Sequence, residues 1–284
     1  MNNKTIAKNV KEGFNSLKAI YPISDYIGSK SGYSFIANLT SRFLPSGGRI
    51  LDLGCGGMDK TGLLALMGYE MHAADDFQDP WHLRDDNLKK LKSFAKELGI
   101  TITVQDIGNY KLDYPENYFD GCMINDVIEH LHESPKDLLN NAGRWLREGG
   151  VLLVTMPNSV NLRKRLSVLL GRSNYPSVEM FYENIGHWRG HVREYTLAEQ
   201  EYILRKNGFS VLFSGTYHAM LEAKLKSGFA KYAYLAVCRL LPTLRDSLAT
   251  VAQKPSGWKP IREDADVFRK SAAGFVPKGE RKSE

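Results

Sequence analysis

The chain has 284 residues, of which 43% are hydrophobic and 25% are charged, and its formal net charge is +6. This length and apolar content suffice for one large globular domain or two small ones, and they exclude an intrinsically disordered chain. The modest basic excess is compatible with an anionic substrate, a nucleic acid or an acidic membrane surface. It selects none of these partners by itself.

The three cysteines, Cys55, Cys122 and Cys238, are far apart and form neither a CxxC pair nor a metal-ligand spacing. The sequence therefore predicts no metal site, and a reduced, intracellular chain is the simplest interpretation. The first residues lack the apolar stretch of a secretory signal, and no segment reaches the ~20 apolar residues of a membrane span. We expect a cytoplasmic protein with at most peripheral membrane contact.

Short apolar runs alternate with amphipathic stretches along the chain, which predicts a mainly parallel sheet with helices on both faces. Residues 1–45 are expected to form an N-terminal helical segment. The predicted strands are residues 49–53, 69–74, 100–105, 119–124, 151–156, 209–214 and 247–252. The predicted helices between them are residues 58–67, 85–98, 136–147 and 197–207.

Two segments do not fit this alternation. Residues 157–195 contain a basic amphipathic stretch and an aromatic loop, and residues 218–241 are mostly apolar and helical in pattern. Because insertions at loop ends commonly shape substrate sites, we expect both to form a lid over an acceptor. The predicted organisation is one domain, residues 46–254, followed by a flexible tail, residues 255–284.

The first predicted strand ends in an acid and a glycine-rich turn, Leu51-Asp52-Leu53-Gly54-Cys55-Gly56-Gly57. Glycine has no β-carbon, so it lets the chain turn tightly and lets a ligand approach the backbone. Glycines after a strand also make ordinary turns. The residues at the other strand ends are needed to distinguish a ligand-binding turn from an ordinary one.

Polar residues follow three of the other predicted strands, at Asp75, Asp106 and Asn125. Ligands of open parallel sheets bind beyond the carboxyl ends of the strands, so we expect these side chains to meet at the glycine turn. Asp75 comes 19 residues after Gly56, and a carboxylate at about this distance suits a ribose diol because its two oxygens accept from two hydroxyls. Asp106 suits an exocyclic amine such as that of adenine, and Ile107 offers an apolar face.

This ordered set of motifs, from Ile50 to about Gly215, resembles the class I S-adenosylmethionine-dependent methyltransferase family, of the type 11/12 kind. The matching segments are Leu51–Gly57, Ala74–Asp75, Gln105–Ile107, Phe119–Asn125, Glu129–Leu131 and Leu146–Gly150. The resemblance implies an α/β fold with a Rossmann-like, doubly wound, seven-stranded and mainly parallel sheet. It also implies that S-adenosyl-L-methionine is held by Asp52, Gly54, Gly56, Asp75, Asp106, Ile107 and Asn125.

One position departs from the family pattern, because the third glycine, two residues after Gly56, is replaced by Met58. A second hypothesis is a nicotinamide-dependent oxidoreductase, but its glycine motif requires glycine at position 59, where Asp59 would face a pyrophosphate. A third hypothesis is a non-catalytic methyltransferase-like module that binds the cofactor without transferring a methyl group.

Individual polar residues also have purely structural interpretations. Asp52 either caps the glycine turn by accepting backbone N–H bonds or contacts the cofactor directly. Asp126 and Glu129 are either solvated residues or helix caps. Thr196 and Glu199 have the spacing of a capping box at the start of a helix.

Methyl transfer requires alignment of donor and nucleophile and, for a hydroxyl acceptor, removal of a proton. Histidine suits this task near neutral pH, and the predicted base is His187, His191 or His130. The resemblance implies a small-molecule, saccharide or lipid-linked acceptor, with O-methylation expected and nucleic acid not expected. The aromatic and basic insertion, residues 157–195, suits a sugar or a phosphate-bearing acceptor.

Overall fold

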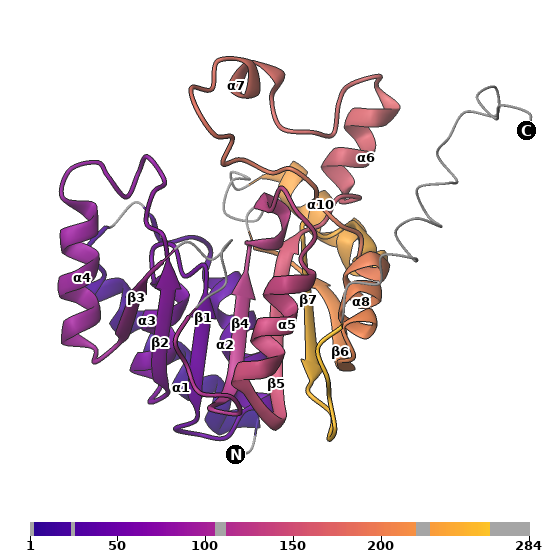
Figure 1. Ribbon diagram of the computed structural model, residues 1–284. Coiled ribbons are helices and arrows are strands. Elements are labelled where there is room, and N and C mark those ends of the chain that lie inside the picture. The colour runs from indigo at the N-terminus through magenta and orange to yellow at the C-terminus, as the bar shows by residue number, and fades with distance from the viewer. Residues whose placement is uncertain (1–2, 24–25, 106–111, 220–227, 262–284) are drawn as a thin grey trace, which may run out of the picture.

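The computed structural model describes residues 3–23, 26–105, 112–219 and 228–261, and within them seven strands form one sheet (Figure 1). The strand order is β3-β2-β1-β4-β5-β7-β6, and β7 is antiparallel to its neighbours β5 and β6 while the other pairs are parallel. The strands are β1 (Arg49–Leu53), β2 (Glu70–Asp75), β3 (Thr101–Val104), β4 (Phe119–Asn125), β5 (Leu146–Pro157), β6 (Ser210–Tyr217) and β7 (Ser247–Gln253).

Helices cover both faces of this sheet (Figure 1). They are α1 (Asn3–Ile20), α2 (Lys30–Phe43), α3 (Asp59–Leu66), α4 (Asn87–Glu97), α5 (Lys136–Trp145), α6 (Leu162–Leu169), α7 (Val178–Tyr182), α8 (Leu197–Lys206) and α10 (Phe229–Leu240). Short 3-10 helices follow β4 and α10, at η2 (Ile128–His130) and η3 (Pro242–Leu244).

The core has two layers, one on each face of the sheet, because successive side chains of a strand point to opposite faces. In β1, Ile50 packs with residues of α1 to α4, whereas Leu51 packs with residues of α5 and α8. Both side chains are fully buried, and burial of such a side chain stabilises a fold by about 1.5–3 kcal/mol. The two layers fix β1, and therefore the glycine turn at its end, in the middle of the domain.

The predicted fold class is confirmed: the sheet has seven strands and is mostly parallel. The predicted strands overlap the observed ones, and the largest difference is at β5, which begins at residue 146 instead of 151 because Leu146 already pairs with Phe119. Helix α4 begins at Asn87, after Asp85 and Asp86 in left-handed conformations (φ +49° and +57°) that a right-handed helix cannot contain.

The described parts of the two chain ends pack on the sheet. Side chains of α1 and α2 belong to the core layer that covers β1. After β7, the indole N–H of Trp258 donates to the carbonyl of Asn207 at 2.8 Å, and a β-carbon on Gly143 would lie 2.4 Å from the Trp258 ring. The domain boundary at residue 254 and the flexible tail stay predictions.

The described parts of the predicted lid segments lie at one end of the sheet. Figure 1 shows α6 and α7 above the carboxyl ends of the parallel strands, with α10 beneath them. In the part of the chain that the structure describes, no helix combines the length and the apolar character needed to cross a bilayer.

Candidate active site

A cleft of about 600 Å³ lies beyond the carboxyl ends of β1, β2 and β4, where the strand order reverses. The lining includes five of the residues that the sequence predicts for the cofactor: Asp52, Gly54, Gly56, Asp75 and Asn125. The other two, Asp106 and Ile107, lie outside the described residues. The structure therefore brings these five residues together in one cleft, and their contacts with a cofactor stay predictions.

The glycine turn after β1 has a left-handed backbone at Gly54 (φ +73°) and Gly56 (φ +50°). Met58, which replaces the third glycine, also has a positive φ of +53°, at a cost of about 1–2 kcal/mol for a residue with a β-carbon. Its side chain is fully buried, and deletion of such a side chain costs about 2–5 kcal/mol. Packing therefore outweighs the backbone strain, which explains why methionine is tolerated there.

Asp75 connects the glycine turn to the end of β2. One carboxylate oxygen accepts the N–H of Gly56 at 2.9 Å, and the other accepts the N–H of Phe77 at 2.8 Å. Burial raises the pKa of this carboxyl. Each oxygen keeps a lone pair for a further donor, so the carboxylate can hold the turn and accept bonds from a ligand at the same time.

Asp52 and Asn125 each carry a polar atom without a hydrogen-bond partner among the described residues, Oδ1 of Asp52 and Nδ2 of Asn125. Oδ2 of Asp52 accepts the hydroxyl of Thr61 at 2.6 Å, and Oδ1 of Asn125 accepts the hydroxyl of Thr155 at 3.0 Å. The turn N–H at Gly56 goes to Asp75, so Asp52 does not serve as the turn cap that the sequence allowed. Burial raises the pKa of Asp52 to about 6.

The cleft has a strongly negative lining: seven of the described lining residues are acidic and two are basic. The acidic ones are Asp52, Asp59, Asp75, Asp76, Asp79, Asp126 and Glu133, and the basic ones are Lys60 and Arg189. Asp126 forms an ion pair with Lys60 at 2.9 Å. The two sequence interpretations of Asp126, a solvated residue or a helix cap, did not include this pair. Such a lining suits a ligand with positive charge and disfavours a pyrophosphate, which argues against the nicotinamide hypothesis.

The residues before α2 cover the glycine turn. Tyr26 lines the cleft and stacks on Trp81 with ring centroids 4.6 Å apart. The hydroxyl of Tyr21 donates to the carbonyl of Gly57 at 2.7 Å. A β-carbon on Gly57 would lie 2.5 Å from the Tyr26 ring and 2.7 Å from the Tyr21 hydroxyl, so this close approach requires glycine.

Replacement of Gly57 by alanine is expected to lower the free energy of unfolding by about 1–3 kcal/mol, because the two tyrosines must move away. Urea denaturation measures this loss. Gly28→Ala is the matched control, since a β-carbon there meets only the Tyr33 ring at 3.8 Å, an ordinary contact. Equal stability of the two variants would contradict the expected crowding at Gly57.

The three predicted histidines lie on the lid side of the cleft. His130 and His187 line it, while His191 lies beside His130 with ring centroids 4.8 Å apart. Nδ1 of His130 donates to the carbonyl of Arg189 at 2.7 Å, and burial lowers the pKa of His130. His187 is exposed, and its ring lies 4.3 Å from that of His132. The structure thus brings His130 and His191 together and leaves His187 at the rim.

Sequence reasoning missed two residues on this side. Glu129 is neither solvated nor exposed, because it is fully buried below the lid. Arg189 reaches from the lid to the loop after β2, where its guanidinium donates two bonds of 2.9 Å to Asp76 and a further bond of 2.5 Å to Asp79. The only sequence signal for Arg189 was its place between two histidines in the aromatic insertion.

Comparisons with known proteins find methyltransferases. A family model described as a methyltransferase domain matches residues 30–213. The chain is 29% identical over 168 residues to the ubiquinone biosynthesis O-methyltransferase of Rickettsia felis, covering 56% of this chain and 58% of that protein. It is 30% identical over 116 residues to phosphoethanolamine N-methyltransferase 3 of Arabidopsis thaliana, covering 39% of this chain and 21% of that protein.

The chain spans about half the length of the curated relatives with the ubiquinone name. Among solved structures, a SAM-dependent methyltransferase of Archaeoglobus fulgidus has a similar fold, with a TM-score of 0.51, 19% identity and coverage of 78% of this chain and 94% of that chain. The family model covers more than half of the present chain and includes the glycine turn, β2 and β4. The chain therefore belongs to the class I methyltransferase family, whose cofactor is S-adenosyl-L-methionine.

Proposed function

We propose that the chain transfers the methyl group of S-adenosyl-L-methionine to an oxygen atom of a small-molecule, saccharide or lipid-linked acceptor. The observation that carries this proposal is the acidic cleft at the strand ends, where buried polar atoms of Asp52 and Asn125 lack partners in the described part of the chain. When bound, the cofactor supplies an electrophilic methyl group on a positively charged sulfur.

The residues of the cleft fit the separate parts of this cofactor. Asp75 is proposed to accept the two ribose hydroxyls, as a carboxylate with free lone pairs can. Oδ1 of Asp52 and Nδ2 of Asn125 are complementary to the ammonium and carboxylate groups of the methionine part. Asp106 and Ile107 are proposed, from the sequence alone, to contact the adenine.

We propose that His130, rather than His187 or His191, accepts the hydroxyl proton of the acceptor. His130 lines the cleft, and its Nδ1–H is already donated to the lid, so Nε2 remains as the accepting nitrogen. The acceptor oxygen would take the methyl group that the cofactor supplies, S-adenosylhomocysteine would leave, and His130 would accept the hydroxyl proton. Closure of the lid would keep water away from this step.

An acceptor with an apolar part is supported by the lid surface. Ile185 is 97% exposed, and further exposed apolar side chains of the lid are Leu169, Leu170, Tyr175, Val178, Met180, Phe181 and Tyr182. Exposed apolar groups beside a cleft are typical of a site that receives an apolar ligand or contacts a lipid surface. We therefore favour a lipid-linked acceptor and peripheral membrane contact. The name of the Rickettsia relative favours oxygen as the acceptor atom, whereas that of the Arabidopsis relative favours nitrogen.

The test is transfer of a labelled methyl group from S-adenosyl-L-methionine to fractionated extracts of the host, with phosphoethanolamine as a separate nitrogen acceptor. We expect label in a lipid or small-molecule fraction, in a product whose methyl is bound to oxygen. Label on phosphoethanolamine alone would show that the acceptor atom is nitrogen and that the proposed oxygen acceptor is wrong. Tight cofactor binding without label in any fraction would support the non-catalytic binding module instead.

Asp52→Asn is expected to stabilise the cofactor-free protein at pH 8 and to weaken cofactor binding. Burial raises the pKa of Asp52 from 3.8 to about 6, so the fold favours the protonated form, and this contribution is lost as the pH rises through about 6. A shift of about two units corresponds to about 3 kcal/mol as an upper value. Urea denaturation of both proteins at pH 5 and pH 8 measures the gain, which must be larger at pH 8. A gain that does not depend on pH would contradict the assignment.

A further inference from the structure

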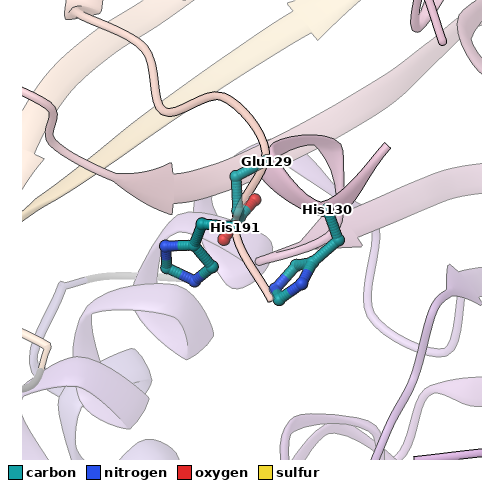
Figure 2. Close-up of side chains that lie close together, drawn as sticks. All are labelled: Glu129, His130 and His191. Atoms are coloured by element: carbon teal, nitrogen blue, oxygen red, sulfur yellow. The ribbon is translucent and has the colours of Figure 1, made fainter. Parts of the chain in front are cut away.

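Glu129, His130 and His191 form a compact cluster between η2 and the lid. Figure 2 shows the carboxylate of Glu129 beside the two imidazole rings. The possible ligand atoms of these three residues all lie within 4.8 Å of one another. Two imidazole nitrogens and a carboxylate oxygen are a donor set that proteins use for Zn²⁺ and Fe²⁺.

Backbone contacts hold the lid over η2 at this cluster. The carbonyl of Glu129 accepts the N–H groups of Val192 at 2.7 Å and Arg193 at 3.1 Å. The bond from His130 to the carbonyl of Arg189 adds a third link between the same two segments. Because the lid is attached on both sides of residue 191, the His191 side chain is kept next to Glu129.

The carboxylate of Glu129 is fully buried, and both of its oxygens lack a hydrogen-bond partner among the described residues. Two further acids, Asp126 and Glu194, act on Glu129 repulsively, and Lys60 acts on it attractively. Transfer of an unpaired carboxylate out of water is costly, so this position favours a bound cation.

Both histidines are oriented as metal ligands usually are. His130 uses Nδ1 to donate to a backbone carbonyl, and His191 has Nδ1 2.8 Å from the carboxylate of Glu194. Glu194 is paired in turn with Lys164. A histidine whose Nδ1–H is held by a carbonyl or carboxylate presents the lone pair of Nε2 to a metal, and such outer partners fix the ring in place.

We infer that Glu129, His130 and His191 bind one divalent first-row cation of the Zn²⁺ class, with an open coordination position toward the cleft. A cation about 2.1 Å from each ligand needs ligand atoms about 3–4 Å apart, so the cluster must contract by about 1 Å. The partly exposed side chain of His191 allows this movement. The sequence predicted no metal because His191 lies 61 positions after His130 and the ligands include no cysteine.

The catalytic part of this inference rests on the proposed function. The acceptor oxygen would bind the cation at its open coordination position, and the cation would lower the pKa of the acceptor hydroxyl, so that the proton leaves to solvent before methyl transfer. His130 then acts as a ligand of the cation and not as a free base. The binding part stands on the geometry alone, so it can be tested without an acceptor.

The test is titration of chelator-treated protein with Zn²⁺ by calorimetry and with Co²⁺ by visible absorption. We expect one equivalent of either ion, and a rise of the melting temperature with Zn²⁺. Glu129→Gln and His191→Ala should each weaken binding at least about 10-fold, and Glu194→Gln should weaken it about 10- to 100-fold through the orientation of His191. Glu129→Gln removes a buried charge at constant shape, so it should fold at least as well as the natural protein.

The matched control is the second histidine pair of the lid region, His132 and His187, which has no buried carboxylate beside it in the described structure. The His132→Ala, His187→Ala double variant should keep full Zn²⁺ binding. Absence of stoichiometric binding, or binding that survives Glu129→Gln and His191→Ala, would overturn the metal site while leaving His130 as the free base. Zn²⁺ binding in a protein that methylates no fraction would uphold the site and remove only its catalytic role.

Discussion

Asp75→Asn is expected to weaken binding of S-adenosyl-L-methionine by about 100-fold or more. The carboxylate is proposed to accept two ribose hydroxyls, and a hydrogen bond to a charged group contributes about 1.5–3 kcal/mol. In the natural protein Asp75 accepts the N–H groups of Gly56 and Phe77. Asparagine keeps one acceptor oxygen, but its NH2 group is a donor and would face one of these two N–H donors. The glycine turn would therefore lose a restraint in addition to the lost ligand contacts.

Calorimetry with S-adenosyl-L-methionine and with S-adenosylhomocysteine measures this effect. Both ligands carry the same ribose, so both must lose affinity to the same degree. Asp113→Asn is the control, because Asp113 is exposed and lies away from the cleft. Unchanged affinity in a folded Asp75→Asn protein would show that Asp75 serves only the glycine turn, and the proposed ribose contact would be wrong.

The part of the cleft at the strand ends could be predicted because each of its residues is marked by its neighbours in the sequence. The turn at Gly54 and Gly56 and the acid at Asp75 each lie at the end of an apolar strand, and parallel strands bring such ends to one edge of a sheet. The capping box of Thr196 and Glu199 is confirmed for the same reason, since its partners are three residues apart. Local spacing is sufficient wherever the partners belong to one element or to consecutive ones.

The part of the cleft below the lid could not be predicted, because the residues that contact each other there are distant in sequence and follow no helical or strand periodicity. Arg189 and Asp76 are 113 positions apart, and Glu129 meets His191 only because the lid folds back on η2. A glutamate beside a histidine in a polar stretch resembles an exposed turn, so the burial of Glu129 has no sequence signal. Tertiary packing alone determines this part of the cleft.

Arg189 links the lid to both walls of the cleft, and Arg189→Gln is therefore expected to loosen the lid. Its guanidinium binds Asp76 and Asp79 after β2, and its carbonyl accepts from His130 after β4. Because the guanidinium is partly exposed, we discount the ion pairs for solvent screening and expect a loss of about 1–2 kcal/mol. That loss corresponds to about 10-fold faster dissociation of the cofactor.

Stopped-flow displacement of the bound cofactor measures the dissociation rate, and limited proteolysis reports opening of residues 158–195. Arg172→Gln is the matched control, because Arg172 is an exposed arginine of the same lid. The difference between the two variants should shrink at high ionic strength, since salt screens the contacts of Arg189 with the two carboxylates. Equal dissociation rates at low salt would mean that the backbone bonds of residues 192 and 193 to Glu129 suffice to hold the lid closed.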